Sequence, residues 1–236
     1  MPRAGLLTPL LAALALLLPA LISTADARTV LANANLVGQG PLEVRPVDIG
    51  LGAGELWVSL TWSDWGSPAV SGTGQFNFDN PSSSSVASAA GVVTLSRLRS
   101  CGPVSIYTRM TVAFSGSPPP FAIGPFNVRC QILLGTAGVF QPDGRGFGEA
   151  RPGEVDFGGD GGRLWRLRWS HWGRSTATAT ANGFALVGTA FSAVPARVVA
   201  SSLGLCMGLL EYRQLSVSSM VHGRWTSAHG FRICGV

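Results

Sequence analysis

Charged residues are scarce in this sequence, and lysine is absent from it. Only 12% of the 236 residues are charged, about half of the usual share of roughly 25%. All 17 basic residues are therefore arginines. The sequence also has no long stretch of Glu, Gln and Leu from which a stable surface helix could form. Much of the chain consists instead of Gly, Ser, Thr, Ala and Val. This composition favours short strands and tight turns. We therefore predict an all-β protein.

Motifs of catalysis are missing as well. The sequence has no Gly-x-Ser-x-Gly, no His-Glu-x-x-His and no phosphate-cradling loop. Its histidines, His171, His222 and His229, match no common spacing of metal ligands. We favour a non-catalytic protein that has no cofactor and no metal. The open alternative is a secreted hydrolase with a site in the second half of the chain, around His171 or His229.

The positive charge is spread along the chain. The formal net charge is +5, and Arg163, Arg166 and Arg168 are the only close group of arginines. These three lie in a strand-like stretch, and we interpret them as its solvated face. Because no basic patch stands out, we expect no nucleic-acid partner.

The first residues predict export. The basic start Met1-Pro2-Arg3 precedes an apolar run from Leu6 to Ile22, and Ala25-Asp26-Ala27 then offers the small residues that a signal peptidase reads. We predict a signal peptide over residues 1–27 and a mature protein that is extracellular or associated with the cell envelope. The alternative is an uncleaved anchor, because the apolar run approaches spanning length. Two prolines and the cleavage site argue against it, so we expect no stable membrane insertion after cleavage.

The chain contains an internal duplication. Its clearest sign is Leu60-Thr61-Trp62-Ser63-Asp64-Trp65-Gly66, which returns as Leu167-Arg168-Trp169-Ser170-His171-Trp172-Gly173. The flanking features keep one order in both halves: an Arg-Pro pair, the motif, small alternating residues, a valine pair (Val92-Val93 and Val198-Val199), a cysteine, and a tyrosine six residues beyond it. We predict one domain over residues 28–140 and a second over residues 141–236.

Apolar and polar residues alternate within each copy, which is typical of half-buried strands. Val58, Leu60 and Trp62 alternate with Ser59 and Thr61 in the first copy, and the second copy repeats this pattern. We expect four or five strands per copy, folded into a small antiparallel β-sandwich or barrel-like domain. Residues 81–85 and 118–120 are rich in Ser and Pro, and we predict loops there.

The four cysteines predict disulfides, because an exported chain folds in an oxidising compartment. Three pairings are possible, and the duplication selects Cys101 with Cys130 and Cys206 with Cys234. Each domain has only a small core, so each bridge would contribute about 3–4 kcal/mol to its stability.

The motif tryptophans are the most distinctive residues of both copies. We place Trp62 and Trp169 on the apolar faces of their strands, in the core. Trp65 and Trp172 follow the strand, where they form either part of the core or a stacking platform for sugar rings and other flat ligands. We select Trp65, Trp172 and Arg109 as candidate binding residues. Asp48 and Asp156 lie at comparable places beside Gly-rich turns, and we expect them to stabilise these turns.

Several of these segments resemble an uncharacterised group of secreted actinobacterial proteins. The resemblance is carried by the tryptophan motif, by Ala69-Val70-x-Gly72-Thr73-Gly74, by Val93-Thr94-Leu95-Ser96 and by Tyr107-Thr108-Arg109-Met110-Thr111-Val112. It covers most of both copies, although the second has Tyr212-Arg213-Gln214-Leu215 in place of the last segment. The resemblance implies export and a small β domain, and it implies no activity.

Together these features favour an exported tandem binding module. Two weak sites on one chain raise the effective affinity for a partner. We expect this partner to be an envelope polysaccharide or a protein. A further alternative is a secreted inhibitor or effector that engages a protein through the loop at residues 118–120.

Overall fold

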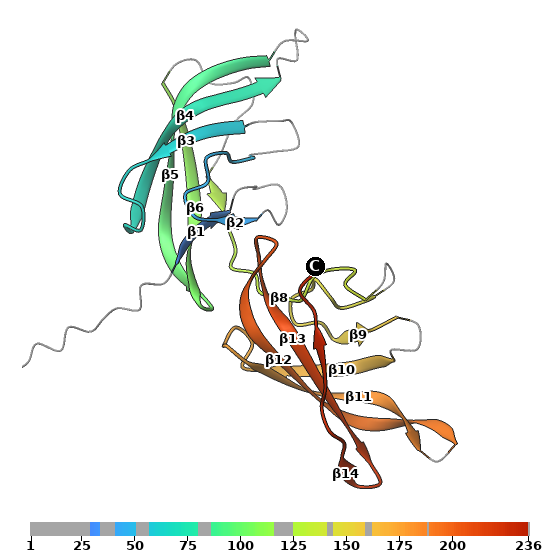
Figure 1. Cartoon of the computed structure of the whole chain (residues 1–236). Coiled ribbons are helices and arrows are strands. Elements are labelled where there is room, and N and C mark those ends of the chain that lie inside the picture. The colour runs from blue at the N-terminus through green and yellow to red at the C-terminus, as the bar shows by residue number, and fades with distance from the viewer. Residues whose placement is uncertain are drawn as a thin grey trace, which may run out of the picture.

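The structure is a computed structural model that describes residues 29–33, 41–50, 57–79, 86–115, 125–140, 144–158, 162–187 and 189–235. These residues form two curled β-sheets, one from each copy, and include no helix (Figure 1). The predicted all-β fold with two domains is therefore confirmed. In the same ranges no helix is long and apolar enough to cross a membrane. The predicted signal peptide and the loops at 81–85 and 118–120 lie outside the described residues.

The first sheet has seven strands in the order β2-β1-β6-β5-β4-β3, and β7 also pairs with β6. Its strands are β1 (Val30–Asn33), β2 (Leu42–Glu43), β3 (Trp57–Trp62), β4 (Ala69–Asp79), β5 (Val86–Cys101), β6 (Val104–Phe114) and β7 (Phe126–Asn127). The long strands β3 to β6 form consecutive antiparallel hairpins, whereas β1 runs parallel to β6.

The second sheet has eight strands in the order β14-β13-β12-β11-β10-β9, and β8 and β15 both pair with β13. Its strands are β8 (Leu133–Leu134), β9 (Glu154–Asp156), β10 (Arg163–Ser170), β11 (Ala177–Val187), β12 (Ala190–Cys206), β13 (Leu209–Val221), β14 (Arg224–Trp225) and β15 (His229–Arg232). Here β8 runs parallel to β13, as β1 does to β6. The second sheet therefore already includes residues that precede the predicted boundary at residue 141.

Strand register aligns the two copies residue by residue. Trp62 pairs with Gly72 on β4, and Trp169 pairs with Ala179 on β11. Gly72 and Ala179 pair on their other sides with Val93 and Val198. Both valines are fully buried. The valine pairs are thus offset by one residue from the predicted match, because Val93 corresponds to Val198 and not to Val199.

Each sheet curls around an apolar core. The core of the first domain includes Ile49, Phe76 and Met110, and all three are at most 1% exposed. A larger cluster fills the second domain and also takes in Leu31, Val104 and Ile106 from the first. Leu42 N–H also donates a 2.5 Å hydrogen bond to the Gly208 carbonyl. The two domains therefore share apolar packing and a backbone contact.

Both predicted disulfides are present. Cys101 is bonded to Cys130 and Cys206 to Cys234, with Cα–Cα distances of 5.6 Å and 5.9 Å. The first cysteine of each bridge is the last residue of β5 or of β12, at the turn into the next long strand. The second cysteine lies near the C-terminal end of the same copy. The pairing within each copy follows the duplication.

A cluster of two tryptophans and one tyrosine forms in each domain. In the first domain, the rings of Trp62 and Trp65 meet edge to face at 5.2 Å, and Trp65 meets Tyr107 at 5.5 Å. The matching distances in the second domain are 4.9 Å and 5.1 Å. Edge-to-face aromatic pairs at such distances stabilise a fold beyond the area that they bury.

The tyrosine hydroxyl of each cluster holds the tryptophan turn against the central strand. Tyr107 Oη accepts a 3.1 Å hydrogen bond from Gly66 N–H and donates a 2.9 Å bond to the Ser67 carbonyl. Tyr212 does the same with Gly173 and Arg174, at 2.9 Å each. Gly66 has a φ of 98°, a conformation that glycine adopts without strain.

Removal of either hydroxyl should destabilise its domain. Tyr107→Phe or Tyr212→Phe removes two part-buried hydrogen bonds to the turn, so the free energy of unfolding should fall by about 0.5–1.5 kcal/mol per bond. Urea unfolding of each variant measures this change. Phe keeps the aromatic ring and lacks only the hydroxyl group. An unchanged urea midpoint in both variants would therefore contradict a stabilising role of the hydroxyl.

Candidate functional site

The predicted binding residues Trp65 and Trp172 lie in the aromatic clusters and are partly buried. Each indole N–H donates a 3.3 Å hydrogen bond to a backbone carbonyl, that of Val30 for Trp65 and that of Ile132 for Trp172. Their polar atoms thus already have partners within the fold, and their rings pack against the two cores. This geometry gives both tryptophans a packing role, and ligand binding by them stays a prediction.

Trp62 and Trp169 are held in the same way. Their indole N–H groups donate to the carbonyls of Pro46 and Pro152, at 2.7 Å and 2.9 Å. Both side chains are partly buried and pack against the core of their domain. The Arg-Pro pairs that precede each motif therefore supply the carbonyl that fixes its first tryptophan.

The third predicted binding residue is Arg109, which makes none of the hydrogen bonds that hold the motif tryptophans. It is partly buried on β6, where it pairs with Ser96 on one side and Asn127 on the other. No hydrogen bond or ion pair links it to Trp65 among the described residues. The histidines of the alternative hydrolase site, His171 and His229, are exposed.

The acidic residue that corresponds to Asp48 is Glu154 and not Asp156. Leu60 N–H bonds to the Val47 carbonyl, and Leu167 N–H bonds to the Gly153 carbonyl, so the next residue in each copy is the acid. Asp156 instead accepts a 2.9 Å hydrogen bond from Gly158 N–H. Asp156 therefore stabilises a turn, as predicted.

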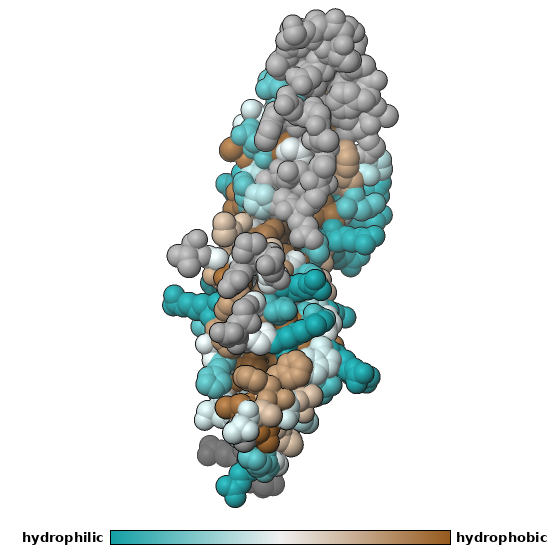
Figure 2. All heavy atoms as spheres, turned by 90° about the vertical axis from the view of Figure 1, so that its right-hand side faces the viewer, coloured by the Kyte–Doolittle hydropathy of each residue, from teal (hydrophilic) through white to brown (hydrophobic). Residues whose placement is uncertain are grey.

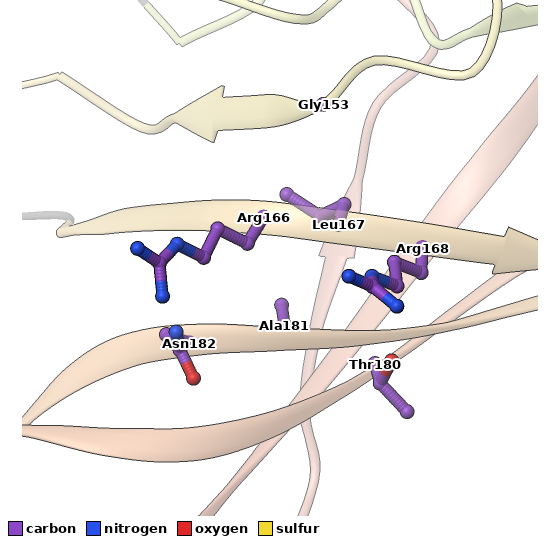
Figure 3. Close-up of a pocket in the computed structure, with 7 residues that line it drawn as sticks. All are labelled: Gly153, Arg166, Leu167, Arg168, Thr180, Ala181 and Asn182. Carbon is purple, nitrogen blue, oxygen red and sulfur yellow. The ribbon is translucent and has the colours of Figure 1, made fainter.

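A shallow groove lies on the outer face of the second sheet. It has a volume of about 600 Å³ and is lined by Arg166 and Arg168 of β10 and by Thr180 and Asn182 of β11 (Figure 3). Arg166 has a φ of 57° and lies in an irregularity of the β10–β11 register. Figure 3 shows both arginine side chains running in the same direction along β10.

The first sheet has the same groove with different residues. Its volume is about 470 Å³, and its lining includes Ser59, Thr61, Thr73 and Gln75. By strand register, Thr61, Thr73 and Gln75 occupy the positions of Arg168, Thr180 and Asn182. Ser59 occupies the position of Trp165, because Arg166 lies in the register shift of the second sheet. The two domains therefore have related concave surfaces, in which the Thr61 hydroxyl stands at the position of the Arg168 guanidinium and Arg166 has no counterpart in the first domain.

The acidic residue beside each groove is engaged differently. In the first domain the Ser59 hydroxyl donates to Asp48 at 3.3 Å. In the second, Glu154 forms a 2.6 Å ion pair with Arg163. That ion pair is the only one among the described residues. The charges of Arg166 and Arg168, which are both exposed, are thus left for a ligand.

A second unusual feature of this domain is a buried carboxyl group. Glu211 is 0% exposed and replaces Ile106 of the first domain by strand register. Its Oε1 accepts a 2.9 Å hydrogen bond from the Thr136 hydroxyl, while Oε2 has no partner. The sulfurs of Cys206 and Cys234 lie within 4.8 Å of it. Because these sulfurs are bonded to each other, they are not free to bind a metal.

Burial determines the protonation of Glu211. Loss of solvation raises its pKa from 4.5 to about 7, against the opposing effect of the Thr136 hydrogen bond. The fold therefore favours the protonated acid, whose O–H is a donor without a fixed acceptor. The carboxyl group titrates near neutral pH inside the domain.

Loss of Trp172 should damage stability before it affects binding. Trp172→Ala removes a packed ring and leaves a cavity, so the free energy of unfolding should fall by about 3 kcal/mol. Trp165→Ala is the matched control, because Trp165 faces outward against Phe184 and its loss should cost less. Urea unfolding of the second domain compares them. Lost ligand binding with unchanged stability in Trp172→Ala would instead support the stacking platform.

Glu211 should make stability depend on pH. The pKa of Glu211 is about 7 in the folded protein and the usual 4.5 in the unfolded chain. The protonated carboxyl group therefore contributes fully to the stability of the fold below pH 4.5. This contribution is lost as the pH rises to 7. The free energy of unfolding should fall across this window by on the order of 3 kcal/mol. Glu211→Gln keeps the shape without the charge, and its stability should not change over the same range. Equal pH profiles for both proteins would disprove the assignment.

Comparison with known proteins adds no relative to this geometry. No protein-family model, no curated protein and no solved structure matches the chain. The candidate site therefore has to be interpreted from its own residues.

Proposed function

We propose that the chain is an exported, non-catalytic binding protein whose second domain holds an anionic polymer of the cell envelope. The observation that carries this proposal is the groove of Arg166 and Arg168, which the first domain repeats without its charges. Two disulfides within a small all-β chain are typical of proteins that fold in an oxidising compartment. The apolar N-terminal run supports export.

The chemistry of the groove favours phosphate or carboxylate groups. A guanidinium presents a planar fork of N–H donors that binds such groups in a bidentate manner. Arg166 and Arg168 lie two residues apart on β10, and both side chains line the groove. Thr180 and Asn182 add uncharged donors and acceptors on the neighbouring strand. The groove thus offers adjacent sites for successive anionic groups of a flexible chain.

The alternative functions receive less support from the described residues. A hydrolase would need a base or a carboxylate beside His171 or His229, and both histidines are exposed at strand ends. The loop at residues 118–120, on which an inhibitor would depend, lies outside the described residues. A polymer-binding module remains the function that the geometry supports best.

The groove should account for most of the affinity. We expect the full mature chain to bind poly(glycerol phosphate) in calorimetry and to ignore neutral dextran. Arg166→Gln/Arg168→Gln keeps the side-chain bulk and should raise the Kd at least tenfold, because it removes two charge-assisted contacts.

The control removes the same charge elsewhere in the domain. Arg224→Gln/Arg232→Gln alters two exposed arginines on β14 and β15 and should change the Kd less than twofold. An equal loss in both double variants would reduce the interaction to overall positive charge and reject the groove. Absence of binding by the unaltered protein would reject the proposal itself.

A further inference from the structure

An apolar patch covers the end of the β11–β12 hairpin. Phe184, Leu186 and Phe191 are 54%, 57% and 76% exposed. Leu186 pairs with Phe191, and Phe184 pairs with Ala193, so all of these side chains lie on one face of the hairpin. Trp165 extends the patch, because its ring lies 4.8 Å from that of Phe184. Figure 2 shows apolar side chains gathered over the lower part of the molecule, which contains this hairpin.

The end of this hairpin extends beyond its neighbouring strands. Pairing between β10 and β11 ends at Gly183, and pairing between β12 and β13 begins at Ala196. Among the described residues, the hairpin beyond these points pairs only with itself. It forms a two-stranded projection from the sheet (Figure 1), where no other strand covers the patch.

The fold itself does not require an apolar end here. By strand register, Phe184 and Leu186 occupy the positions of Asn77 and Asp79 in the first domain. The same scaffold thus carries polar residues at these two positions in the first domain and large apolar residues in the second, while Val86 is the smaller counterpart of Phe191. Exposed apolar patches of this kind mark surfaces that interact with a partner.

Charge identifies the kind of partner. No charged residue occurs from Ser175 to Ala196. Arg197 is exposed on β12, where it pairs with Thr180, whereas Arg174 lies in the tryptophan turn at the opposite end of the hairpin. Arg166 and Arg168 are exposed on the same outer face of the sheet. The strands β11 and β12 contain no acidic residue. An apolar end bordered by cations complements a lipid surface, where acyl chains lie beneath anionic headgroups.

We propose that the β11–β12 hairpin docks on an anionic lipid bilayer. Phe184, Leu186 and Phe191 enter the boundary between headgroups and acyl chains, and the arginines behind them contact headgroup phosphates. This contact is peripheral and involves no spanning segment. Its apolar contacts lie outside the polymer groove, and it shares the exposed Arg166 and Arg168 with that groove.

Vesicle co-sedimentation tests this docking. The full mature chain should bind vesicles of phosphatidylcholine and phosphatidylglycerol more tightly than vesicles of phosphatidylcholine alone. Phe184→Ser/Phe191→Ser should weaken binding to the mixed vesicles at least tenfold without changing the net charge. Met207→Ser removes a 71% exposed apolar side chain from another turn and should have no effect.

The outcomes separate this proposal from its alternatives. The tip variant should keep its melting temperature and its affinity for soluble poly(glycerol phosphate), so that failure here leaves the proposed polymer site unaffected. Equal vesicle binding by the tip variant and the native chain would overturn the docking. A native chain that ignores vesicles but forms dimers in sedimentation velocity, and loses them in the tip variant, would assign the patch to a second copy instead.

Discussion

One buried tyrosine hydroxyl in each domain holds the rest of the domain in place. Tyr107 and Tyr212 are at most 1% exposed, and burial raises the pKa of both phenols. Each hydroxyl satisfies both a donor and an acceptor of the tryptophan turn. In the first domain that turn joins β3 and β4, and the indole N–H of Trp65 donates to the Val30 carbonyl of the parallel strand β1. In the second domain Trp172 donates to the Ile132 carbonyl, just before the parallel strand β8. The hydroxyl thus connects three separate segments of the chain.

This constraint explains which residues differ between the copies. Positions in the tyrosine cluster keep their residues, because a change there would leave a cavity or an unpaired polar atom. Other core positions change in size, since Phe76 corresponds to Gly183 and Leu95 to Ala200. Positions on the outer face have no such restriction, and there Thr61 corresponds to Arg168, while the register shift of β10 adds Arg166. Among the described residues, the buried position that changes from an apolar to an ionisable side chain is Glu211 in place of Ile106. It makes the second domain sensitive to pH in a way that the first is not.

The sequence alone predicts the strands, the duplication and both disulfides, because alternation and repeated spacing depend on local chemistry. It misassigned the partner of Asp48 and the valine pairs, because single-residue register depends on backbone bonds such as that of Leu60 to Val47. The arginines were predicted to face solvent, and they do. Their groove was not predictable, since it also needs the left-handed backbone of Arg166 and the capture of Glu154 by Arg163.

The hairpin ends show how a duplicated fold can acquire a new surface. An inward side chain contributes to folding through burial, so its apolar character needs no further explanation. Phe191 is 76% exposed and contributes little to the core, while it makes the folded protein less soluble. Leu186, which pairs with Phe191, has the same disadvantage. The first domain has Asp79 at the position of Leu186 and the smaller Val86 at the position of Phe191. Because burial does not account for these residues, their exposure is the observation on which the proposed docking rests.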